Sequence, residues 1–431
     1  MTSDEIVRKY REFIYPLLTY YREPLPITSG QGCLVSDAEG REYLDFFGGI
    51  LTVSVGHCLE AITAKIAVQL GKLQHISTLY PTAPAADLAE MLSRITPGGL
   101  RKSFFTNSGT EADEMAVLTA QIHTGSTDVI ALRHSYSGRS AMAMSLTGHA
   151  YWKASKVLLP GIHHAHAPYC YRCPFRLEYP SCDLACARDI EELVRTETGG
   201  RVAAMIAEPI LGVGGFIVPP REYFQVAAAI VRRYGGLFIA DEVQTGWGRT
   251  GGKWFGIEQF DLVPDIMTSA KGMANGIPIG WTTTTPEVAD SFKGATISTF
   301  GGNPVSCAAA IATLQFIEEH RLLAHVESMG AAFRSGLLEL REEFASIGDV
   351  RGMGLMLAME IVKDRKGKVP DPETVLRIFE ETRKEGLLIG KGGLYGNVIR
   401  LSPPMTVTMS QVKTGLKMLR AALGRAIGKK E

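Results

Sequence analysis

Two residues of complementary chemistry, Asp241 and Lys271, each follow an apolar run that predicts a buried strand. Asp241 closes the run GLFIAD, where an unpaired anion away from water is costly and needs a cationic partner. Lys271 follows DIMTSA among apolar and small residues, where desolvation lowers the pKa of the amine and makes it a nucleophile and a base. Taken singly, Asp241 could begin an ordinary loop, and Lys271 could be a solvated lysine in a loop. Together they indicate a site that combines a carboxylate with a reactive amine.

A third stretch has the pattern of a helix start that can bind an anion. The strand-like KSFFT runs through Asn107 into Ser108, Gly109 and Thr110, and a helical pattern follows. Ser108 can cap this helix with Glu111 closing a capping box, which leaves the N–H groups of Gly109 and Thr110 facing an anion. An ordinary capped helix explains this stretch alone equally well. Beside an amine and a carboxylate, a phosphate site is favoured.

Four more residues at predicted strand ends would complete a site for a flat aromatic ligand. Tyr136 follows DVIALR and can stack on a ring, while Val243 lies on the same side of an extended chain as Asp241 and can pack on the other ring face. Gln244 can reach a polar ring substituent, and Glu208, which closes VAAMIAE, either joins this network or caps a loop. A protonated pyridine nitrogen would supply the cation that Asp241 needs. Phosphate site, ring carboxylate and amine together match pyridoxal phosphate.

The elements that must position these residues follow from length and pattern. The 431-residue chain, 45% apolar, can bury more than one core. Between positions 61 and 315 apolar runs alternate with helical patterns, which is typical of a mostly parallel sheet flanked by helices, with ligands at the carboxyl ends of the strands. We therefore expect a large cofactor-binding domain over 61–315 and a smaller α+β domain over 316–431. Residues 1–60, with a helix predicted at 4–21 and then a hairpin, should join the smaller domain.

The charge balance argues against a nucleic-acid or membrane partner. Forty-five basic and forty-five acidic residues give no formal net charge, whereas binding to a phosphate backbone needs a basic stripe. No apolar run approaches the roughly 20 residues of a membrane helix, and the start MTSDEIVRKYREF lacks the apolar core of a secretory signal. We expect a cytoplasmic protein whose partners are small molecules.

Four of the seven cysteines lie close together in the sequence, beside three histidines. Their spacing, Cys-x2-Cys followed by Cys-x3-Cys, suits a tetrahedral zinc site, a disulfide framework or free thiols in an ordered loop. The sequence leaves these three possibilities open, and we expect no metal in the catalytic site. The residues concerned are Cys170, Cys173, Cys182 and Cys186, with His163, His164 and His166.

The motifs NSGTEA, HSYSGR, IADEVQTGWGRTG, SAKG, TFGGNP and IRLSPP occur in this order along the chain. In these motifs, which extend over nearly its whole length, the chain resembles the class III, or ω-type, aminotransferases among the fold-type I pyridoxal-phosphate enzymes. Within that family, YLDFFGGILTVSVGHC, DVRGMGLM and GLLIGKGG look most like the alanine–glyoxylate group. The resemblance implies a mostly parallel seven-stranded sheet in the large domain, pyridoxal 5′-phosphate as cofactor, and ping-pong transamination.

The resemblance also implies a role for each candidate residue. The cofactor phosphate would be bound by Ser108, Gly109 and Thr110 and, from the neighbouring subunit of a homodimer or a dimer of dimers, by Thr299. The cofactor ring would be contacted or supported by Tyr136, Glu208, Asp241, Val243 and Gln244. The catalytic residues would be Asp241, on the pyridine nitrogen, and Lys271, which forms a Schiff base with the cofactor. Arg400 in IRLSPP would clamp a substrate carboxylate, for which a bidentate guanidinium is suited.

One departure from the family pattern bears on the substrate. Val213 stands where the γ-aminobutyrate and ornithine enzymes resemble one another in having a glutamate that pairs with the substrate-binding arginine. Without that partner, Arg400 should stay available for an α-carboxylate, which favours an alanine-like donor with glyoxylate or pyruvate as acceptor. Dialkylglycine decarboxylase or aminomutase chemistry on the same scaffold is the alternative, and a non-catalytic protein that retains the pocket is a further one.

Overall fold

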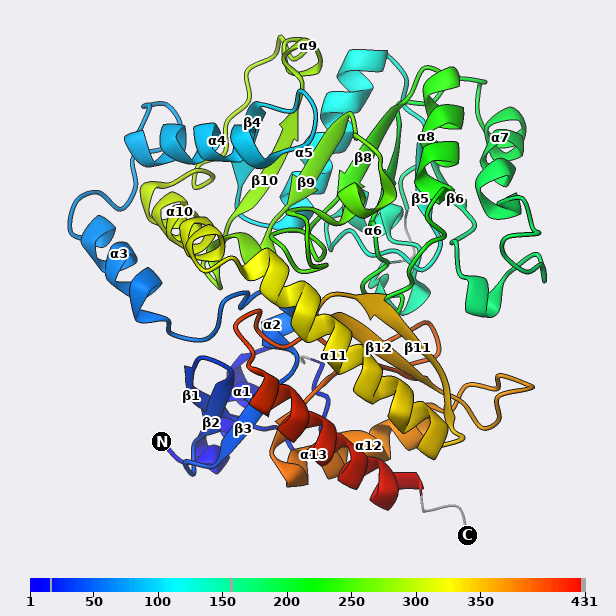
Figure 1. Ribbon diagram of the computed structural model, residues 1–431. Helices are drawn as coiled ribbons and strands as arrows, with labels where there is room; N and C mark the ends of the chain where they lie inside the picture. Colours follow the sequence, from blue (N-terminus) through cyan, green and yellow to red (C-terminus); the bar gives the residue numbers. More distant parts are fainter. Residues whose placement is uncertain (16–17, 156–157, 428–431) are drawn as a thin grey trace.

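The computed structural model describes residues 1–15, 18–155 and 158–427, and its larger part is built on a seven-stranded sheet (Figure 1). The strands are parallel except β10, which runs antiparallel to β4 and β9. This confirms the predicted α/β fold with its mostly parallel seven-stranded sheet. In spatial order the strands are β4 (Lys102–Thr106), β10 (Gly280–Thr284), β9 (Ile266–Ser269), β8 (Leu237–Asp241), β7 (Ala204–Ala207), β5 (Val129–Leu132) and β6 (Ile162–Ala165).

Helices cover both faces of this sheet, so its central strands are buried throughout. In Figure 1, α8 lies in front of the strands and α5 behind them; α8 packs on β8, and α5 packs on β9 and β10. Double coverage explains why these strands read as apolar runs without alternation. The helices of this part are α3 (Glu60–Leu70), α4 (Ala83–Ile95), α5 (Gly109–Thr124), α6 (Ala141–Leu146), α7 (Ala185–Glu197), α8 (Tyr223–Arg233), α9 (Pro286–Ala289) and α10 (Pro304–Glu319). The short α2 (Gly48–Leu51) lies between this part and the smaller sheets (Figure 1).

One strand of the large sheet was not visible as an apolar run. β6 carries His163 and His164, and it is an edge strand paired with β5 alone. The ring of His163 contacts the carboxylates of Asp128 at 2.9 Å and Glu197 at 3.2 Å. An edge position tolerates such polar side chains because one side of the strand is not enclosed by neighbours.

Two four-stranded sheets form the rest of the structure. One has the order β11-β12-β15-β14, and the other, β1-β2-β3-β13, joins the N-terminal hairpin to a strand near the end of the chain through the parallel pairing of Leu44 with Leu387. The strands are β1 (Ile27–Gln31), β2 (Leu34–Asp37), β3 (Glu42–Asp45), β11 (Ile347–Met353), β12 (Met356–Ile361), β13 (Leu387–Leu388), β14 (Gly390–Gly392) and β15 (Val398–Leu401). The helices are α11 (Leu322–Glu343), α12 (Pro372–Glu385) and α13 (Met409–Ile427).

The N-terminal helix is shorter than expected. Helix α1 (Ser3–Phe13) begins with a capping box between Thr2 and Glu5 and ends at Phe13, whereas the sequence predicted a helix over 4–21. The residue before a proline is disfavoured in helical backbone, and the sequence has Pro16. Positions 16 and 17 lie outside the described residues, and Leu18 to Tyr21 are not helical.

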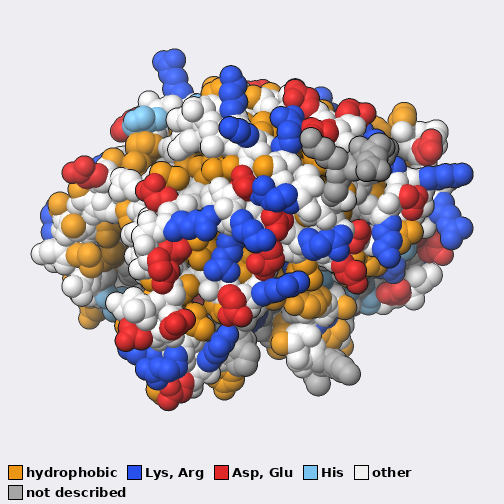
Figure 2. Space-filling model, turned by 90° about the horizontal axis from the view of Figure 1, so that it is seen from below, with side chains coloured by type: hydrophobic (Ala, Val, Ile, Leu, Met, Phe, Trp, Pro, Cys, Tyr) orange, Lys and Arg blue, Asp and Glu red, His pale blue; other side chains and the backbone are white. Residues whose placement is uncertain are grey.

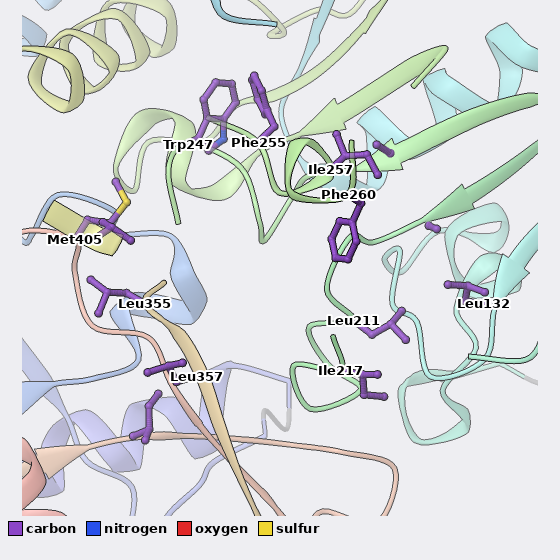
Figure 3. Packing of buried hydrophobic residues seen from close by; sticks show 14 of the residues in the cluster. Leu132, Leu211, Ile217, Trp247, Phe255, Ile257, Phe260, Leu355, Leu357 and Met405 are labelled. Atoms are coloured by element: carbon purple, nitrogen blue, oxygen red, sulfur yellow. The ribbon is translucent and has the colours of Figure 1, made fainter. Parts of the chain in front are cut away.

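The loop that follows β8 is fixed by aromatic packing. Trp247 lies 5.2 Å from the ring of Phe255 and 5.6 Å from that of Trp281. Figure 3 shows Trp247 beside Phe255, with Leu355 and Met405 approaching from the other part of the chain, and all belong to one buried cluster. The two parts therefore share a continuous core, and the residues around β8 and β9 are held from both sides.

The exposed surface matches the balanced composition. On the face shown in Figure 2, basic and acidic side chains are interspersed, without a broad patch of one sign. Within residues 1–15, 18–155 and 158–427, no helix combines the length and apolar character needed to cross a membrane.

Candidate active site

Strands β8 and β9 are parallel neighbours, so their carboxyl ends bring Asp241 and Lys271 to the same edge of the sheet. Asp241 is the last residue of β8, is 3% exposed, and accepts a hydrogen bond from the N–H of Val243 at 3.0 Å. Lys271 begins a short 3₁₀ turn, η4 (Lys271–Ala274), with φ at +40°. Left-handed backbone is uncommon for a residue other than glycine and is often found at functional sites.

The charges of this pair are strongly affected by their surroundings. Burial raises the pKa of Asp241 to about 6, although the hydrogen bond from the N–H of Val243 and the charge of Lys271 both act to lower it. Burial lowers the pKa of Lys271, and the charge of Arg400 adds to this, while Asp241 and Glu208 oppose it. Among the described residues, no ion pair within 4.0 Å involves Asp241 or Lys271. Each group is therefore available to a third partner.

The start of helix α5 offers N–H groups that no helix carbonyl can accept. Ser108 is its N-cap, and the Ser108 hydroxyl accepts from the N–H of Glu111 at 3.3 Å. The Glu111 carboxylate accepts instead from the N–H of Asn107 at 2.6 Å, so the predicted capping box is wrong in its second half. The N–H groups of Gly109 and Thr110, at the positive end of a 16-residue helix, remain for an anion.

Glu208 connects two loops of the site. Its carboxylate accepts from the N–H of Tyr136 at 3.0 Å and from the N–H of Gly212 at 2.8 Å. Burial and, after it, the charge of Asp241 raise the pKa of Glu208 to about 8. Tyr136 is half-buried and meets Trp152 edge-on, with ring centroids 5.7 Å apart. Glu208 thus fixes the backbone that presents Tyr136.

Val243 and Gln244 pack directly on glycines of the site. A Cβ on Gly109 would lie 2.9 Å from a methyl group of Val243, and a Cβ on Gly212 would clash with the Gln244 amide. The Gln244 side chain is buried, and its Oε1 has no hydrogen-bond partner in the described structure. Buried polar atoms are normally satisfied, so this oxygen points to a ligand.

Arg400 lies on β15 with 2% of its surface exposed. Its guanidinium donates to the carbonyls of Lys391 at 2.9 Å and Gly212 at 3.3 Å, and it lies over the rings of Phe47 and Phe216, 5.0 and 5.4 Å from their centroids. Burial lowers the pKa of Arg400. Across the described ranges, no carboxylate forms an ion pair with this guanidinium.

The profile of the family described as Aminotransferase class-III matches residues 19–423 of this chain. The chain belongs to this family. The chain is 42% identical to alanine–glyoxylate aminotransferase 2 homolog 2, mitochondrial, of Arabidopsis thaliana, over 94% of this chain and 84% of that protein. It is 37% identical to a 5-aminovalerate aminotransferase of Pseudomonas aeruginosa, over 97% of both chains.

A solved structure agrees with these relatives. An amine transaminase from an uncultivated Pseudomonas species, in its form with bound pyridoxal phosphate, superposes with a TM-score of 0.91 at 33% identity, over 96% of this chain and 99% of that chain. This class-III aminotransferase is therefore an enzyme that catalyses transamination with pyridoxal phosphate, which confirms the predicted cofactor and reaction type.

The residues of this aminotransferase fit that cofactor. Asp241 is a buried carboxylate without a cation, the Gln244 Oε1 is buried without a partner, and the start of α5 has free N–H groups. Pyridoxal phosphate carries a ring nitrogen, a ring hydroxyl and a phosphate that match these three features.

Thr299 is the candidate that the structure does not bring to the others. It is exposed and lines a surface pocket with Ile76, Tyr80 and Ile297. None of the cofactor residues of the same chain lines this pocket.

The clustered cysteines line a pocket that includes none of the candidate site residues of this aminotransferase. All four are unpaired thiols that line one small pocket with Tyr169 and Phe175. Over the described part of the chain, no group of three or more His, Cys, Asp or Glu residues is arranged to hold a metal ion. The structure therefore supports neither the zinc site nor the disulfide framework.

Asp113 on α5 is a site residue that the sequence reasoning missed. It is 1% exposed, and its Oδ1 accepts a hydrogen bond from the hydroxyl of Thr268 at 2.7 Å. The signal was present in the helical spacing, because Asp113 lies on the same face as the small apolar residues Ala116, Val117 and Ala120. An acid within such an apolar stripe indicates a buried polar contact.

Proposed function

We propose that this aminotransferase takes the amino group of an alanine-like α-amino acid and passes it to glyoxylate or pyruvate. The observation that carries this proposal is the buried Arg400, which has no carboxylate partner in the described residues. An unpaired buried guanidinium is costly, and a bound α-carboxylate would satisfy it through two parallel hydrogen bonds. Val213, 8% exposed, offers no carboxylate to compete. Nothing in the comparisons favours decarboxylase or mutase chemistry.

The roles of the site residues are part of this proposal. Bound pyridoxal phosphate supplies an electron sink that weakens the Cα–H bond of the amino donor. Asp241 would bind the ring nitrogen, Tyr136 and Val243 would pack on the two ring faces, and Gln244 would bind the ring hydroxyl. Ser108, Gly109 and Thr110 bind the phosphate at the start of α5. Glu208 holds the loop backbone that carries Tyr136.

Lys271 has the reactive role. Because its pKa is lowered, a larger fraction of its amine is neutral, and the neutral form attacks an aldehyde carbon and accepts a proton. Arg400 orients the donor through its carboxylate, so that the Cα proton is presented to Nζ of Lys271. Lys271 thus performs the chemistry, and Arg400 selects the substrate.

A donor and acceptor panel with the purified enzyme tests the substrate. Alanine with glyoxylate or pyruvate should give the highest kcat/KM, with parallel-line kinetics when both substrates are varied, because the amino group is carried on the enzyme between two half-reactions. Ornithine, 4-aminobutyrate and 5-aminovalerate should be poor donors. If one of these three is the best donor, the assignment of Arg400 to an α-carboxylate is wrong.

The substitution Val213→Glu should weaken the selection of α-amino acids. By the family pattern, a glutamate here pairs with Arg400 and withdraws it from the substrate, so we expect KM for alanine to rise about tenfold or more, with a smaller change in kcat. Val213→Gln, similar in size but uncharged, is the matched control and should leave KM closer to that of the wild type. Equal effects of the two variants would point to bulk instead of charge.

We also propose that the active unit is a homodimer in which Thr299 binds the cofactor phosphate of the neighbouring subunit. The support is the exposed apolar surface around Thr299, formed by Ile76, Tyr80 and Ile297, because a second copy of the chain would cover it.

Mixing two variants that each impair a different part of the site tests whether the site is shared. In a hybrid of Lys271→Ala and Thr299→Val chains, one of the two sites would contain wild-type Lys271 from one chain and wild-type Thr299 from the other. We expect co-refolded mixtures to be more active than either variant alone. Activity no higher than the average of the two variants would show that Thr299 serves no neighbouring site.

The cytoplasmic location remains part of the proposal. It differs from that of the Arabidopsis relative, which is described as mitochondrial. Cell fractionation with an antibody against the full-length protein would decide between the two.

A further inference from the structure

Asp113 adds a second carboxyl group behind the one that faces the cofactor ring. In the sheet, Thr268 of β9 is the register partner of Asp241 of β8. The Thr268 hydroxyl donates to Oδ1 of Asp113 from helix α5. The Asp113 and Asp241 carboxyl groups are themselves within hydrogen-bonding distance of one another. Three side chains from three elements therefore meet behind the ring site.

The hydrogen bonds of this group determine where a proton must be. The Thr268 hydroxyl uses its hydrogen on Oδ1 of Asp113, so Oδ1 is an acceptor. The other oxygen, Oδ2, is buried, and no N–H or hydroxyl of the described residues donates to it. Two carboxylates repel, and they hydrogen-bond only when one of them is protonated.

Of the two carboxyl groups, that of Asp113 is more easily protonated than that of Asp241. Burial raises the pKa of Asp113 well above its usual range, and the charge of Asp241 is the next cause. Asp241 has the N–H of Val243 and the charge of Lys271 to stabilise its ionised form. The titratable groups that face Asp113 are thus Asp241 and Glu208, both acidic, and both disfavour a charge on Asp113.

We propose that Asp113 is a positioning residue, protonated at neutral pH, whose Oδ2–H donates to Asp241 and keeps that carboxylate ionised and oriented toward the cofactor nitrogen. This proposal deepens the proposed function, since it concerns the support of the same cofactor site. A neutral donor adds no negative charge behind the ring, and it removes part of the desolvation cost of the Asp241 anion.

Infrared spectroscopy of the full-length protein tests the proton directly. The wild-type protein at neutral pH should show the carbonyl stretch of a protonated carboxylic acid that Asp113→Asn lacks, with and without bound pyridoxal phosphate. Asparagine has the size of protonated aspartic acid, accepts from Thr268 and donates to Asp241, so this variant should fold. Glu114→Gln, at the next position of the same helix, is the matched control and should retain the band. A wild-type spectrum without the Asp113-dependent band overturns the proposal.

The pH dependence of stability gives a second readout. If the pKa of Asp113 is higher in the folded than in the unfolded protein, its contribution to stability is fully present below the ordinary aspartate pKa, near pH 4. That contribution is lost as the pH rises toward the folded-state pKa. Asp113→Asn removes this loss, so its melting temperature relative to the wild type should increase from about pH 4 upward. A difference that is constant with pH, or that favours the wild type more at higher pH, means that Asp113 is ionised and overturns the proposal.

Cofactor binding separates the donor role from simple packing. Asp113→Asn should bind pyridoxal phosphate within about threefold of the wild type, because the donor is kept. Asp113→Ala should bind it about ten- to a hundredfold more weakly, as expected for the loss of a hydrogen bond to a charged group. Equal loss in both variants would contradict a donor role. None of these measurements needs an amino donor, so a wrong substrate assignment would leave their outcome unchanged.

Discussion

Replacing Lys271 by alanine is expected to reduce transamination by at least about a thousandfold, because one side chain supplies both the nucleophile and the base. Its neighbours already support this chemistry, since burial lowers the pKa of the amine and no described residue forms an ion pair with it. The measurement is kcat/KM for alanine with glyoxylate. The effect should be chemical and not structural, so the melting temperature of the cofactor-free protein should change little.

Three controls make the Lys271 experiment specific. Borohydride reduction followed by peptide mass spectrometry should place the cofactor on Lys271 in the wild type and on no residue in Lys271→Ala. Lys253→Ala removes an exposed lysine from the loop after β8 and should leave activity unchanged. Added methylamine should restore part of the activity to Lys271→Ala if a missing base is the cause. Full activity in Lys271→Ala would falsify the assignment.

Replacing Asp241 by asparagine is the second largest expected effect, a loss of about a hundred- to a thousandfold in kcat. An asparagine keeps the size of the side chain but removes the charge that holds a proton on the ring nitrogen, and without that proton the ring is a weaker electron sink. The loss should appear in kcat more than in KM, because the charge acts on the reacting state. A variant with wild-type kcat would show that Asp241 does not face the ring.

The same substitution should have the opposite effect on the cofactor-free protein. Burial raises the pKa of Asp241 to about 6 in the folded protein, above the ordinary aspartate value of about 3.9. The wild type therefore loses stability as the pH rises through this window, and Asp241→Asn does not. Urea unfolding should show an advantage of the variant that grows between about pH 4 and 6 and is then constant. Asp290→Asn, an exposed aspartate, should show no such trend.

The proximity of Asp241 and Lys271 could be predicted from the sequence because one rule of sheet geometry brings them together. Parallel strands end at one edge of a sheet, and Asp241 and Lys271 follow two apolar runs that became neighbours in the order β9-β8. The roles of Ser108, Tyr136 and Glu208 needed the family resemblance, because a cap, an aromatic ring and a carboxylate at strand ends each have ordinary structural explanations.

The parts that escaped prediction depend on contacts between distant segments. The strand β6 was missed because its histidines interrupt the apolar pattern expected of a strand. The strand β11 was missed because its glycines and charged residues are typical of a loop. Asp113, on helix α5, was missed because its importance depends on side chains from two other elements, Thr268 of β9 and Asp241 of β8. A local sequence pattern does not show which side chains of distant segments will contact a buried helix face.

The pairing of β3 with β13 has a consequence for how the enzyme is made. β3 pairs with β2 on one edge, but its other edge stays unpaired until β13 exists, since there Leu44 pairs with Leu387. Tyr43, Leu44 and Phe46 are buried in the finished protein, yet during synthesis they leave the ribosome long before their partner strand. An apolar strand edge then waits, unpaired, for most of the time of translation, and such edges favour aggregation. Production of this enzyme should therefore benefit from chaperones that shield this edge until translation is complete.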